Sequence, residues 1–236
     1  MIRAGLGVSI GWIGISMISD GVPALLLPHR LLADGQADAT LLGLVTLVAI
    51  AIAAALQPAV GRWSDHVGRF PTMAAGAAVA VAGLALFLAP GSAIIGTIVT
   101  LAGVSVAQAG QQPLVVDRIG PAWRGRAGGL KSAFDVAGAF AAFVLLAILL
   151  GSGQAVLAVA VLAVALVGGF AVSRLLLGDQ PRPAVTRRRL GTSYRLDSEE
   201  HRPLVMLIAA RFLFLLGTYI VGRSLRGRLR RDQARA

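Results

Sequence analysis

Long apolar runs alternate with short polar segments along most of the chain. Seven runs of roughly 20 residues carry almost no charge, and each is long enough to cross a hydrocarbon core about 30 Å thick. They lie at about 4–27, 41–60, 72–90, 93–116, 132–150, 154–173 and 204–222. Because the runs are continuously apolar rather than alternating in polarity, they indicate α-helices and not the strands of a membrane barrel. The chain is therefore predicted to be an all-α polytopic membrane protein.

The composition narrows the class further. Of the 236 residues, 56% are hydrophobic and 14% are charged, whereas soluble domains average about 25% charged residues. So few charges cannot cover a water-facing surface, which excludes a soluble enzyme, a nucleic-acid-binding domain and a disordered chain despite the net charge of +11. The chain has no cysteine and its three histidines lie far apart, so we expect no metal site and no cofactor.

The basic residues are distributed unevenly between the two predicted sides of the membrane. With a cytoplasmic N-terminus, the first three outer loops contain one base, Arg30, and the inner segments contain 14. The inner bases are Arg3, Arg62, Arg69, Arg118, Arg124, Arg126, Lys131, Arg174, Arg182, Arg187, Arg188, Arg189, Arg195 and Arg202. The positive-inside rule therefore predicts a cytoplasmic N-terminus. The abundance of Ala, Gly and Arg is typical of a bacterial genome, so we expect the bacterial cytoplasmic (inner) membrane.

Four parts of the chain differ in polarity. We expect a six-helix transmembrane domain at 1–173, a cytoplasmic linker at 174–203, a seventh transmembrane helix at 204–222 and a basic tail at 223–236. The tail carries six arginines and opposes translocation of this partial or complete seventh helix, so the helix is expected to insert poorly or to remain cytoplasmic. Within the spans, glycines such as Gly76 and Gly83 recur at close-packing intervals and predict helix–helix contacts.

The loop between the second and third spans carries a recognisable motif. It reads G-R-W-S-D-H-V-G-R and supplies Gly61, Arg62, Ser64, Asp65, Gly68 and Arg69. It resembles the G-x-x-x-D-R/K-x-G-R signature of major facilitator superfamily transporters, in the same loop and on the same predicted side. His66 replaces the usual base, and Phe70 stands where a further base is common. A generic charged loop is the alternative interpretation.

A second loop supports the resemblance. The segment from Asp117 to Gly129 is similar to the D-x-x-P-x-x-x-R-G-R-A-x-G pattern that often joins helices four and five in these transporters. Its matching or charged residues are Asp117, Arg118, Pro121, Arg124, Gly125 and Arg126. A nucleotide-binding loop is excluded here because Leu130 separates Gly129 from Lys131.

The resemblance implies a fold and a function. Family members have twelve helices in two halves, each built from 3+3 inverted repeats, with the substrate bound between the halves. The resemblance covers about 4–222, which corresponds to the first six-helix half-bundle, the linker and a seventh helix. We therefore expect a secondary active transporter for an unidentified small solute, driven by protons or sodium, and present here as an incomplete carrier. The alternative is a non-transporting remnant, or a half-subunit that needs a separately encoded second half or a second copy of itself. By resemblance, Asp65 stabilises one of the two conformational states.

Ionisable and amide side chains inside the spans are the candidates for a substrate or ion pathway, because such groups are costly in lipid. Asp20 is expected to carry a proton or cation, to bind a basic substrate group, or simply to reach water at a helix end. Asp135 has the same functional interpretation, or pairs with Lys131 at i,i+4. Gln108, Gln111 and Gln112 predict either substrate contact or hydrogen bonds between helices.

Overall fold

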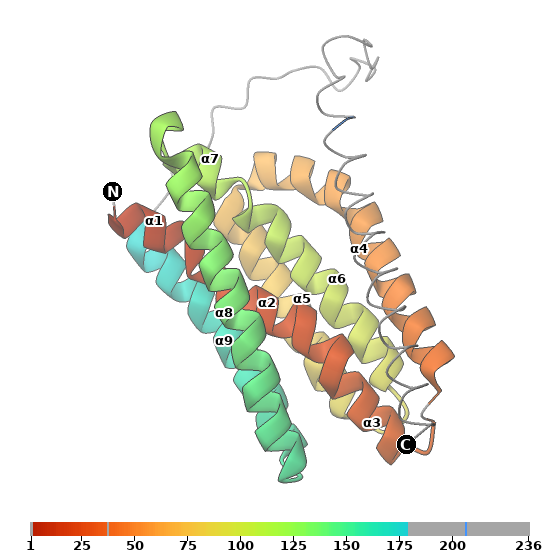
Figure 1. Cartoon of the computed structure of the whole chain (residues 1–236). Helices are drawn as coiled ribbons and strands as arrows, with labels where there is room; N and C mark the ends of the chain where they lie inside the picture. The colour runs from red at the N-terminus through yellow and green to blue at the C-terminus, as the bar shows by residue number, and fades with distance from the viewer. Residues whose placement is uncertain (1, 37, 179–205, 207–236) are drawn as a thin grey trace. The chain divides into compact units, whose positions relative to one another are not determined.

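The computed structural model describes residues 2–36, 38–178 and 206, and over these residues it is helical without a β-strand (Figure 1). Six stretches are long and apolar enough to cross a membrane, which confirms the predicted all-α membrane fold. The elements are α1 (Ile2–Ser9), α2 (Gly11–Gly21), the π-helical turn η1 (Val22–Leu26), α3 (Leu27–Ala33), α4 (Ala39–Val67), α5 (Arg69–Leu88), α6 (Ala93–Gln111), α7 (Leu114–Arg118), the 3-10 turn η2 (Pro121–Trp123), α8 (Arg124–Gly151) and α9 (Ala155–Leu177).

The chain divides into two compact units, Met1–Val185 and Thr186–Ala236. All the elements named above belong to the first unit. The predicted seventh span and the basic tail belong to the second, and apart from Met206 they lie outside the described residues.

Short turns with defined chemistry separate the long helices. Asp38 caps α4 because its side chain accepts a hydrogen bond from the backbone N–H of Thr40 at 2.9 Å, which satisfies one of the free donors of a helix start. Gly68 ends α4 with φ +108°, a conformation that glycine adopts without steric penalty. The chain therefore reverses within one residue, and Arg69 already belongs to α5.

The first span is one membrane-length helical stretch, Ile2–Ala33, as its apolar run predicts, but its backbone hydrogen bonding is interrupted at Ile10. α1 ends at Ser9, and within this described stretch no backbone hydrogen bond from α2 reaches the carbonyls of Gly7 and Val8. Side chains of other helices replace those bonds: the Ser173 hydroxyl donates to the Gly7 carbonyl, and Gln111 Nε2 donates to the Val8 carbonyl at 2.8 Å. Irregular backbone inside a membrane needs such substitute donors.

The helices α5 and α6 are in direct backbone contact. A Cβ atom added to Gly76 would lie 2.3 Å from the backbone nitrogen of Ala107, and one added to Gly83 would lie 2.4 Å from that of Thr100. The same holds from the other helix, where a Cβ on Gly103 would lie 2.3 Å from the nitrogen of Ala80. The packing role predicted for Gly76 and Gly83 is therefore confirmed.

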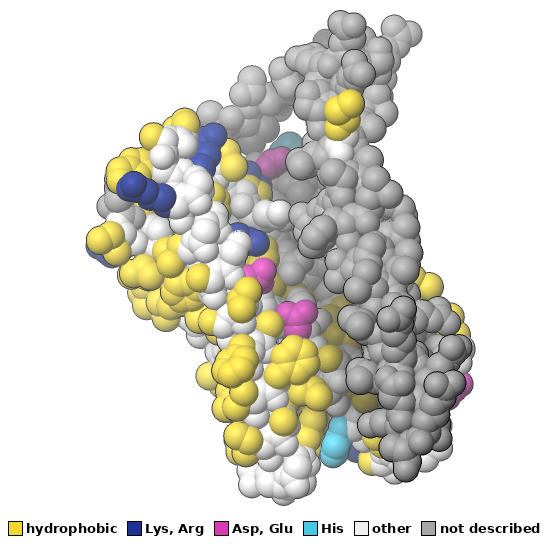
Figure 2. All heavy atoms as spheres, in the orientation of Figure 1, with side chains coloured by type: hydrophobic (Ala, Val, Ile, Leu, Met, Phe, Trp, Pro, Cys, Tyr) yellow, Lys and Arg dark blue, Asp and Glu magenta, His cyan; other side chains and the backbone are white. Residues whose placement is uncertain are grey.

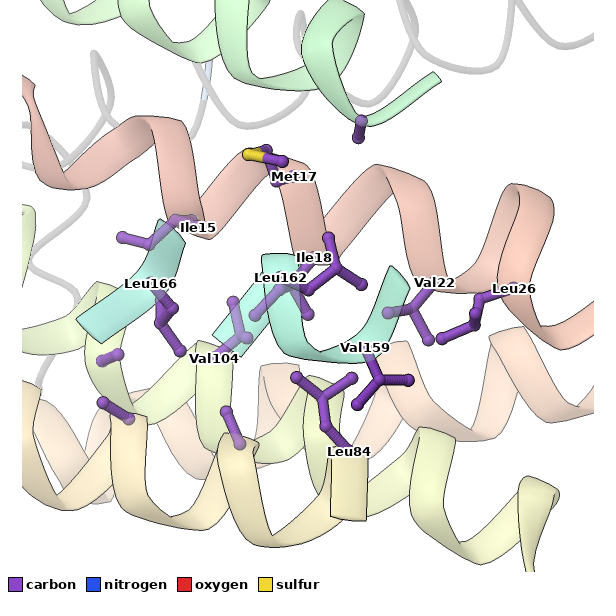
Figure 3. Close-up of a cluster of buried hydrophobic side chains, with 14 of the residues drawn as sticks. Ile15, Met17, Ile18, Val22, Leu26, Leu84, Val104, Val159, Leu162 and Leu166 are labelled. Carbon is purple, nitrogen blue, oxygen red and sulfur yellow. The ribbon is translucent and has the colours of Figure 1, made fainter. Parts of the chain in front are cut away.

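The helices pack in a reciprocal pattern. The helix α2 packs against α8 and α9, and α6 packs against α4 and α5. The first three spans (α1–α3 counted as one, α4 and α5) form one group, and the last three (α6, α8 and α9) form the other. The first span of each group packs against the second and third spans of the other group. This is the arrangement expected of 3+3 inverted repeats. Buried side chains of both groups meet in one core, including Ile15, Ile18, Leu84, Val104, Leu162 and Leu166 (Figure 3).

Candidate functional site

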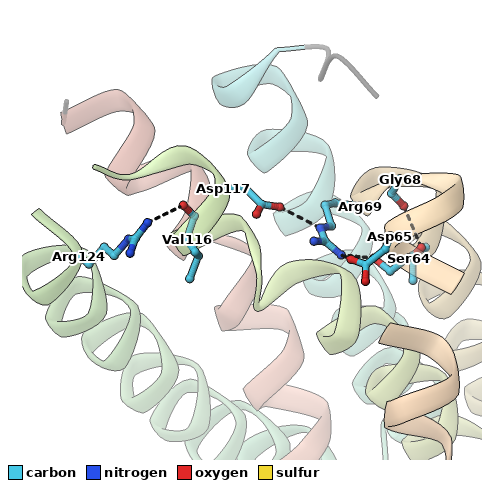
Figure 4. A network of polar contacts seen from close by, with 8 residues as sticks. Ser64, Asp65, Gly68, Arg69, Val116, Asp117 and Arg124 are labelled. Atoms are coloured by element: carbon cyan, nitrogen blue, oxygen red, sulfur yellow. Dashed lines mark hydrogen bonds and ion pairs between the residues drawn. The ribbon is translucent and has the colours of Figure 1, made fainter. Parts of the chain in front are cut away.

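Arg69 is the centre of a polar network at the α4–α5 turn (Figure 4). Its Nη1 donates to Asp65 Oδ1 at 2.6 Å and to Ser64 Oγ at 3.1 Å, and its Nε donates to Asp117 Oδ2 at 2.9 Å. The Arg69 side chain is 11% exposed, while those of Asp65 and Asp117 are 62% and 37% exposed. The guanidinium is therefore held between two carboxylates, and it joins the last turn of α4 to α7.

This arrangement brings together four predicted site residues from both motifs: Ser64, Asp65, Arg69 and Asp117. We refer to these four as the Arg69 network. Asp65 and Arg69 are four residues apart in sequence, whereas Asp117 lies 48 residues beyond Arg69. The network thus connects one loop of the first three-helix group to one loop of the second.

The other motif residues mostly shape the same end of the bundle. Arg124 donates from Nε to the Ile119 carbonyl at 3.2 Å and from Nη2 to the Val116 carbonyl at 3.3 Å, so it ties the start of α8 to the end of α7. The Arg126 guanidinium lies 4.4 Å from the ring centroid of Trp123. Arg62 donates to the Pro58 carbonyl at 3.3 Å, and Pro121 begins the turn η2.

The three remaining motif residues have different surroundings. Gly125 has nothing within 4 Å of an added Cβ, so no close packing explains this glycine. Gly61 lines a pocket of about 300 Å³. Arg118 is part-buried, and its Nη2 is a buried donor without a hydrogen-bond partner among the described residues.

A second cluster of charged groups lies inside the membrane-spanning region, between α2 and α8. The Ser16 hydroxyl donates to Asp135 Oδ1, and the Lys131 Nζ lies 3.6 Å from the ring centroid of Trp12. Asp20 lies within electrostatic reach of Asp135. Figure 2 shows acidic side chains next to a basic one on the face that α2 and α8 form. We call these five residues (Trp12, Ser16, Asp20, Lys131 and Asp135) the α2–α8 seam.

The seam follows from helical spacing on both helices. Trp12, Ser16 and Asp20 are four residues apart on α2, and Lys131 and Asp135 are four apart on α8. Such residues lie above one another on one helix face, so the seam is a ladder in which Trp12 meets Lys131 and Ser16 meets Asp135. The alternative prediction, an ion pair between Lys131 and Asp135, is not what the structure has, because the ammonium lies on the Trp12 ring instead.

A neutral pocket, without charged side chains and lined mostly by apolar ones, lies on the other side of α2. It measures about 340 Å³ and is lined by residues of α2, α4 and α6, with Ser19, Thr46, Gln57, Ser105 and Gln108 among its polar members. Gln57 also lines the 300 Å³ pocket at Gly61, together with Gln112. On this side α2 contributes the Ser19 hydroxyl to a pocket whose amide groups come from α4 and α6, and on the seam side it contributes a carboxylate.

The three predicted glutamines have different surroundings. Gln111 is fully buried, and its amide bonds the Val8 carbonyl, so it joins two helices. Gln108 and Gln112 each line a pocket. Sequence reasoning did not single out Trp12, Ser16 or Ser19, although the four-residue spacing of Trp12, Ser16 and Asp20 was visible.

Comparison with known proteins identifies the family. The model of the Major Facilitator Superfamily matches residues 11–225. The chain therefore belongs to this superfamily of membrane transporters. Searches of curated proteins and of solved structures found no match. Among the described residues, no three His, Cys, Asp or Glu side chains are grouped as metal ligands would be.

Proposed function

We propose that this chain forms the six-helix unit of a secondary active transporter that moves a small solute across the bilayer and is coupled to an ion gradient. The observation that carries the proposal is the α2–α8 seam. With Lys131 protonated and both carboxylates ionised, its net charge is −1 inside a low-dielectric membrane, where an uncompensated charge is costly. One further cation, a proton or sodium, would neutralise the seam, and this is the property that a coupling site needs.

The neutral pocket on the other side of α2 is our candidate for the solute site. Its Ser19 hydroxyl and its Gln57 and Gln108 amides can donate and accept hydrogen bonds. The Thr46 hydroxyl donates to the Leu42 carbonyl and can still accept a bond. Because α2 contributes to both the pocket and the seam, a movement of α2 would affect solute binding and cation binding together. Coupling of the two events is what a secondary transporter requires.

The Arg69 network is our candidate for the conformational switch. It lies at the ends of apolar helices, joins the two three-helix groups and contains the motif Asp65. The charge asymmetry of the loops supports a cytoplasmic position for this network and for the N-terminus.

Uptake into proteoliposomes that contain this chain together with a second six-helix bundle tests the proposed coupling, because the chain alone is expected to be an incomplete carrier. We expect a panel of sugars, amines, carboxylates and drugs to include a solute whose saturable uptake depends on a proton or sodium gradient. Asp135→Asn and Asp20→Asn should abolish the dependence on the gradient. Asp34→Asn is the matched control, because Asp34 pairs with Arg30 at the end of α3, outside the seam. Uptake that stays gradient-driven in both seam variants would refute the proposal.

A second bundle supports the same function in our proposal. Asp20, Gln57 and Gln112 are exposed, and α4 is the least buried of the six spanning helices. Polar side chains of this kind would face lipid unless a second six-helix bundle covers them, either a second copy of the chain or a separate second half. Cysteines at Leu47 and Phe140, both exposed, should cross-link to that bundle; unreacted cysteines and a monomeric mass would contradict it.

A further inference from the structure

The seam contains a lysine whose position the transport proposal does not explain. Lys131 and Asp135 are one helical turn apart on α8, a spacing at which lysine and aspartate side chains commonly pair. In the structure the ammonium lies instead on the face of Trp12, 3.6 Å from its centroid, and Asp135 accepts the Ser16 hydroxyl. The three ion pairs among the described residues, Arg30–Asp34, Arg69–Asp65 and Arg69–Asp117, do not involve the seam.

Two attractions compete for the Lys131 ammonium. A ring face attracts a cation through its quadrupole, whereas an ionised carboxylate attracts it with a full charge, and that attraction is stronger in the low dielectric of a membrane. Lys131 can therefore remain on Trp12 only while Asp135 is neutral or is occupied by another cation. Once Asp135 is ionised and empty, the same flexible side chain reaches it within one helical turn.

The Trp12 ring is a buried partner for the Lys131 ammonium. Trp12 is 5% exposed, so its ring keeps one orientation, and it precedes Ser16 by one turn, just as Lys131 precedes Asp135. The Lys131 ammonium thus has two partners within reach, the Trp12 ring on α2 and the Asp135 carboxylate on α8.

From these contacts we infer that Lys131 is a tethered counter-cation that alternates between the Trp12 ring and Asp135, in competition with the coupling cation. Lys131 is then a positioning residue of the transport cycle. With the coupling cation on Asp135, the lysine lies on Trp12. Without it, the lysine pairs with Asp135, so Asp135 is not left unpaired when the empty seam changes conformation. This inference deepens the coupling role proposed for Asp135 and rests on it.

Other ionisable groups near the seam are few. Asp20 is the remaining ionisable member, on α2. The helices packed against α2 and α8 add Arg3 on α1, Asp117 and Arg118 on α7, Arg124 and Arg126 at the start of α8 and Arg174 on α9, while α6 has none. All of these added groups lie at the end of the bundle that carries the Arg69 network. His29 and Arg30 on α3 lie at the opposite end.

The sequence offers a direct test because Lys131 is its only lysine. Lysine labelled with carbon-13 at Cε gives one side-chain signal from the unmodified chain in lipid nanodiscs. An ammonium held on an indole ring has its neighbouring methylene shifted upfield by the ring current. We expect the upfield position at the acid end of a pH titration, once the carboxylate is neutralised, and loss of the upfield shift at the alkaline end, where an ionised Asp135 attracts the ammonium.

Three variants decide the interpretation. Asp135→Asn should keep the signal upfield at every pH, because no carboxylate is left to attract the lysine. Trp12→Leu should remove the upfield shift throughout, and Trp12→Phe, which keeps a ring, should preserve both the shift and its pH dependence. If circular dichroism shows that Trp12→Leu is not folded, Asp135→Asn and Trp12→Phe still test whether Lys131 moves between the ring and the carboxylate.

Two results would overturn the inference: a signal that stays upfield across the whole titration in the parent chain, or an unchanged transition in Asp135→Asn. Failure of the transport proposal is distinguishable from these. Uptake that is independent of the gradient, with a Lys131 signal that shifts with pH, would refute the ion coupling alone. Gradient-driven uptake with a Lys131 signal that does not shift would refute only the movement of Lys131 between Trp12 and Asp135.

Discussion

Two clusters in this molecule each contain one cation and two carboxylates, yet their contacts differ. In the Arg69 network the guanidinium bonds both carboxylates directly, at 2.6 Å and 2.9 Å. In the α2–α8 seam the Lys131 ammonium bonds neither carboxylate and lies on an aromatic ring. The same nominal charges thus give one closed cluster and one open cluster.

The chemistry of the two cations explains part of the difference. A guanidinium is a planar fork with several fixed donors and can serve two carboxylates at once, whereas an ammonium is a compact charge on a flexible stem. Location explains the rest, because the network lies at helix ends near water and the seam lies between two membrane-spanning helices. The comparison indicates that the network fixes a geometry, while the seam is free to exchange partners.

The largest expected effect is a difference in cysteine labelling, which reports the side of the membrane on which each end of the bundle lies. The chain has no cysteine, so single cysteines can be introduced at His66, beside the network, and at Ser152, in the opposite turn. Because the positive-inside rule places the network in the cytoplasm, we expect an impermeant thiol reagent added to intact cells to label position 152 and not position 66. Labelling of position 66 from outside would reverse the proposed orientation.

Removal of the shared cation should break the closed cluster. Arg69→Ala leaves Asp65 and Asp117 close together without a counter-charge, and we expect a loss of about 1–2 kcal/mol in the free energy of unfolding, discounted for the exposure of both carboxylates. Unfolding by a denaturing detergent, followed by circular dichroism, measures it. Arg62→Ala is the matched control, since Arg62 lies in the same motif but makes one long bond to a backbone carbonyl. Equal losses in the two variants would contradict the role of the network.

Half of the closed cluster was predictable from sequence. Asp65 and Arg69 are close in the chain on either side of a glycine turn, so their pairing follows from local geometry. Asp117 could not be assigned as a partner of Arg69, because that contact depends on how the second group of three helices packs on the first. In the same way, the sequence allowed Lys131 to pair with Asp135, and only the packing of α2 shows that Trp12 competes.

The long elements were predictable for a different reason. Lipid permits helices almost exclusively, so apolar runs of sufficient length determine the spans whatever their packing. The break between Ser9 and Gly11 was not predictable in this way. No proline marks it, and the two side chains that satisfy the freed carbonyls, Gln111 and Ser173, come from distant parts of the chain.

Loss of the Asp65–Arg69 ion pair should affect stability less than transport. Asp65→Asn removes an ion pair to a mostly exposed carboxylate, so we expect a change below about 1 kcal/mol in the free energy of unfolding. If Asp65 stabilises one conformational state, as the family resemblance implies, gradient-driven uptake should fall several-fold with membrane insertion unchanged. His66→Asn is the control in the adjacent position. Wild-type uptake in Asp65→Asn would refute the proposed role.

The smallest change tests whether the seam is open, as the comparison indicates. Ser16→Ala removes the hydroxyl that donates to Asp135, and we expect less than about 1 kcal/mol of lost stability, because Lys131 can supply a replacement bond. The lysine should therefore leave Trp12, and its Cε signal should lose the upfield shift at a lower pH than in the parent chain. Ser19→Ala, on the pocket side of the same helix, should leave the signal unchanged. If Ser16→Ala behaves like Ser19→Ala, then the Ser16 hydroxyl does not influence the position of Lys131. The Trp12–Lys131 and Ser16–Asp135 contacts of the seam would then be independent of each other.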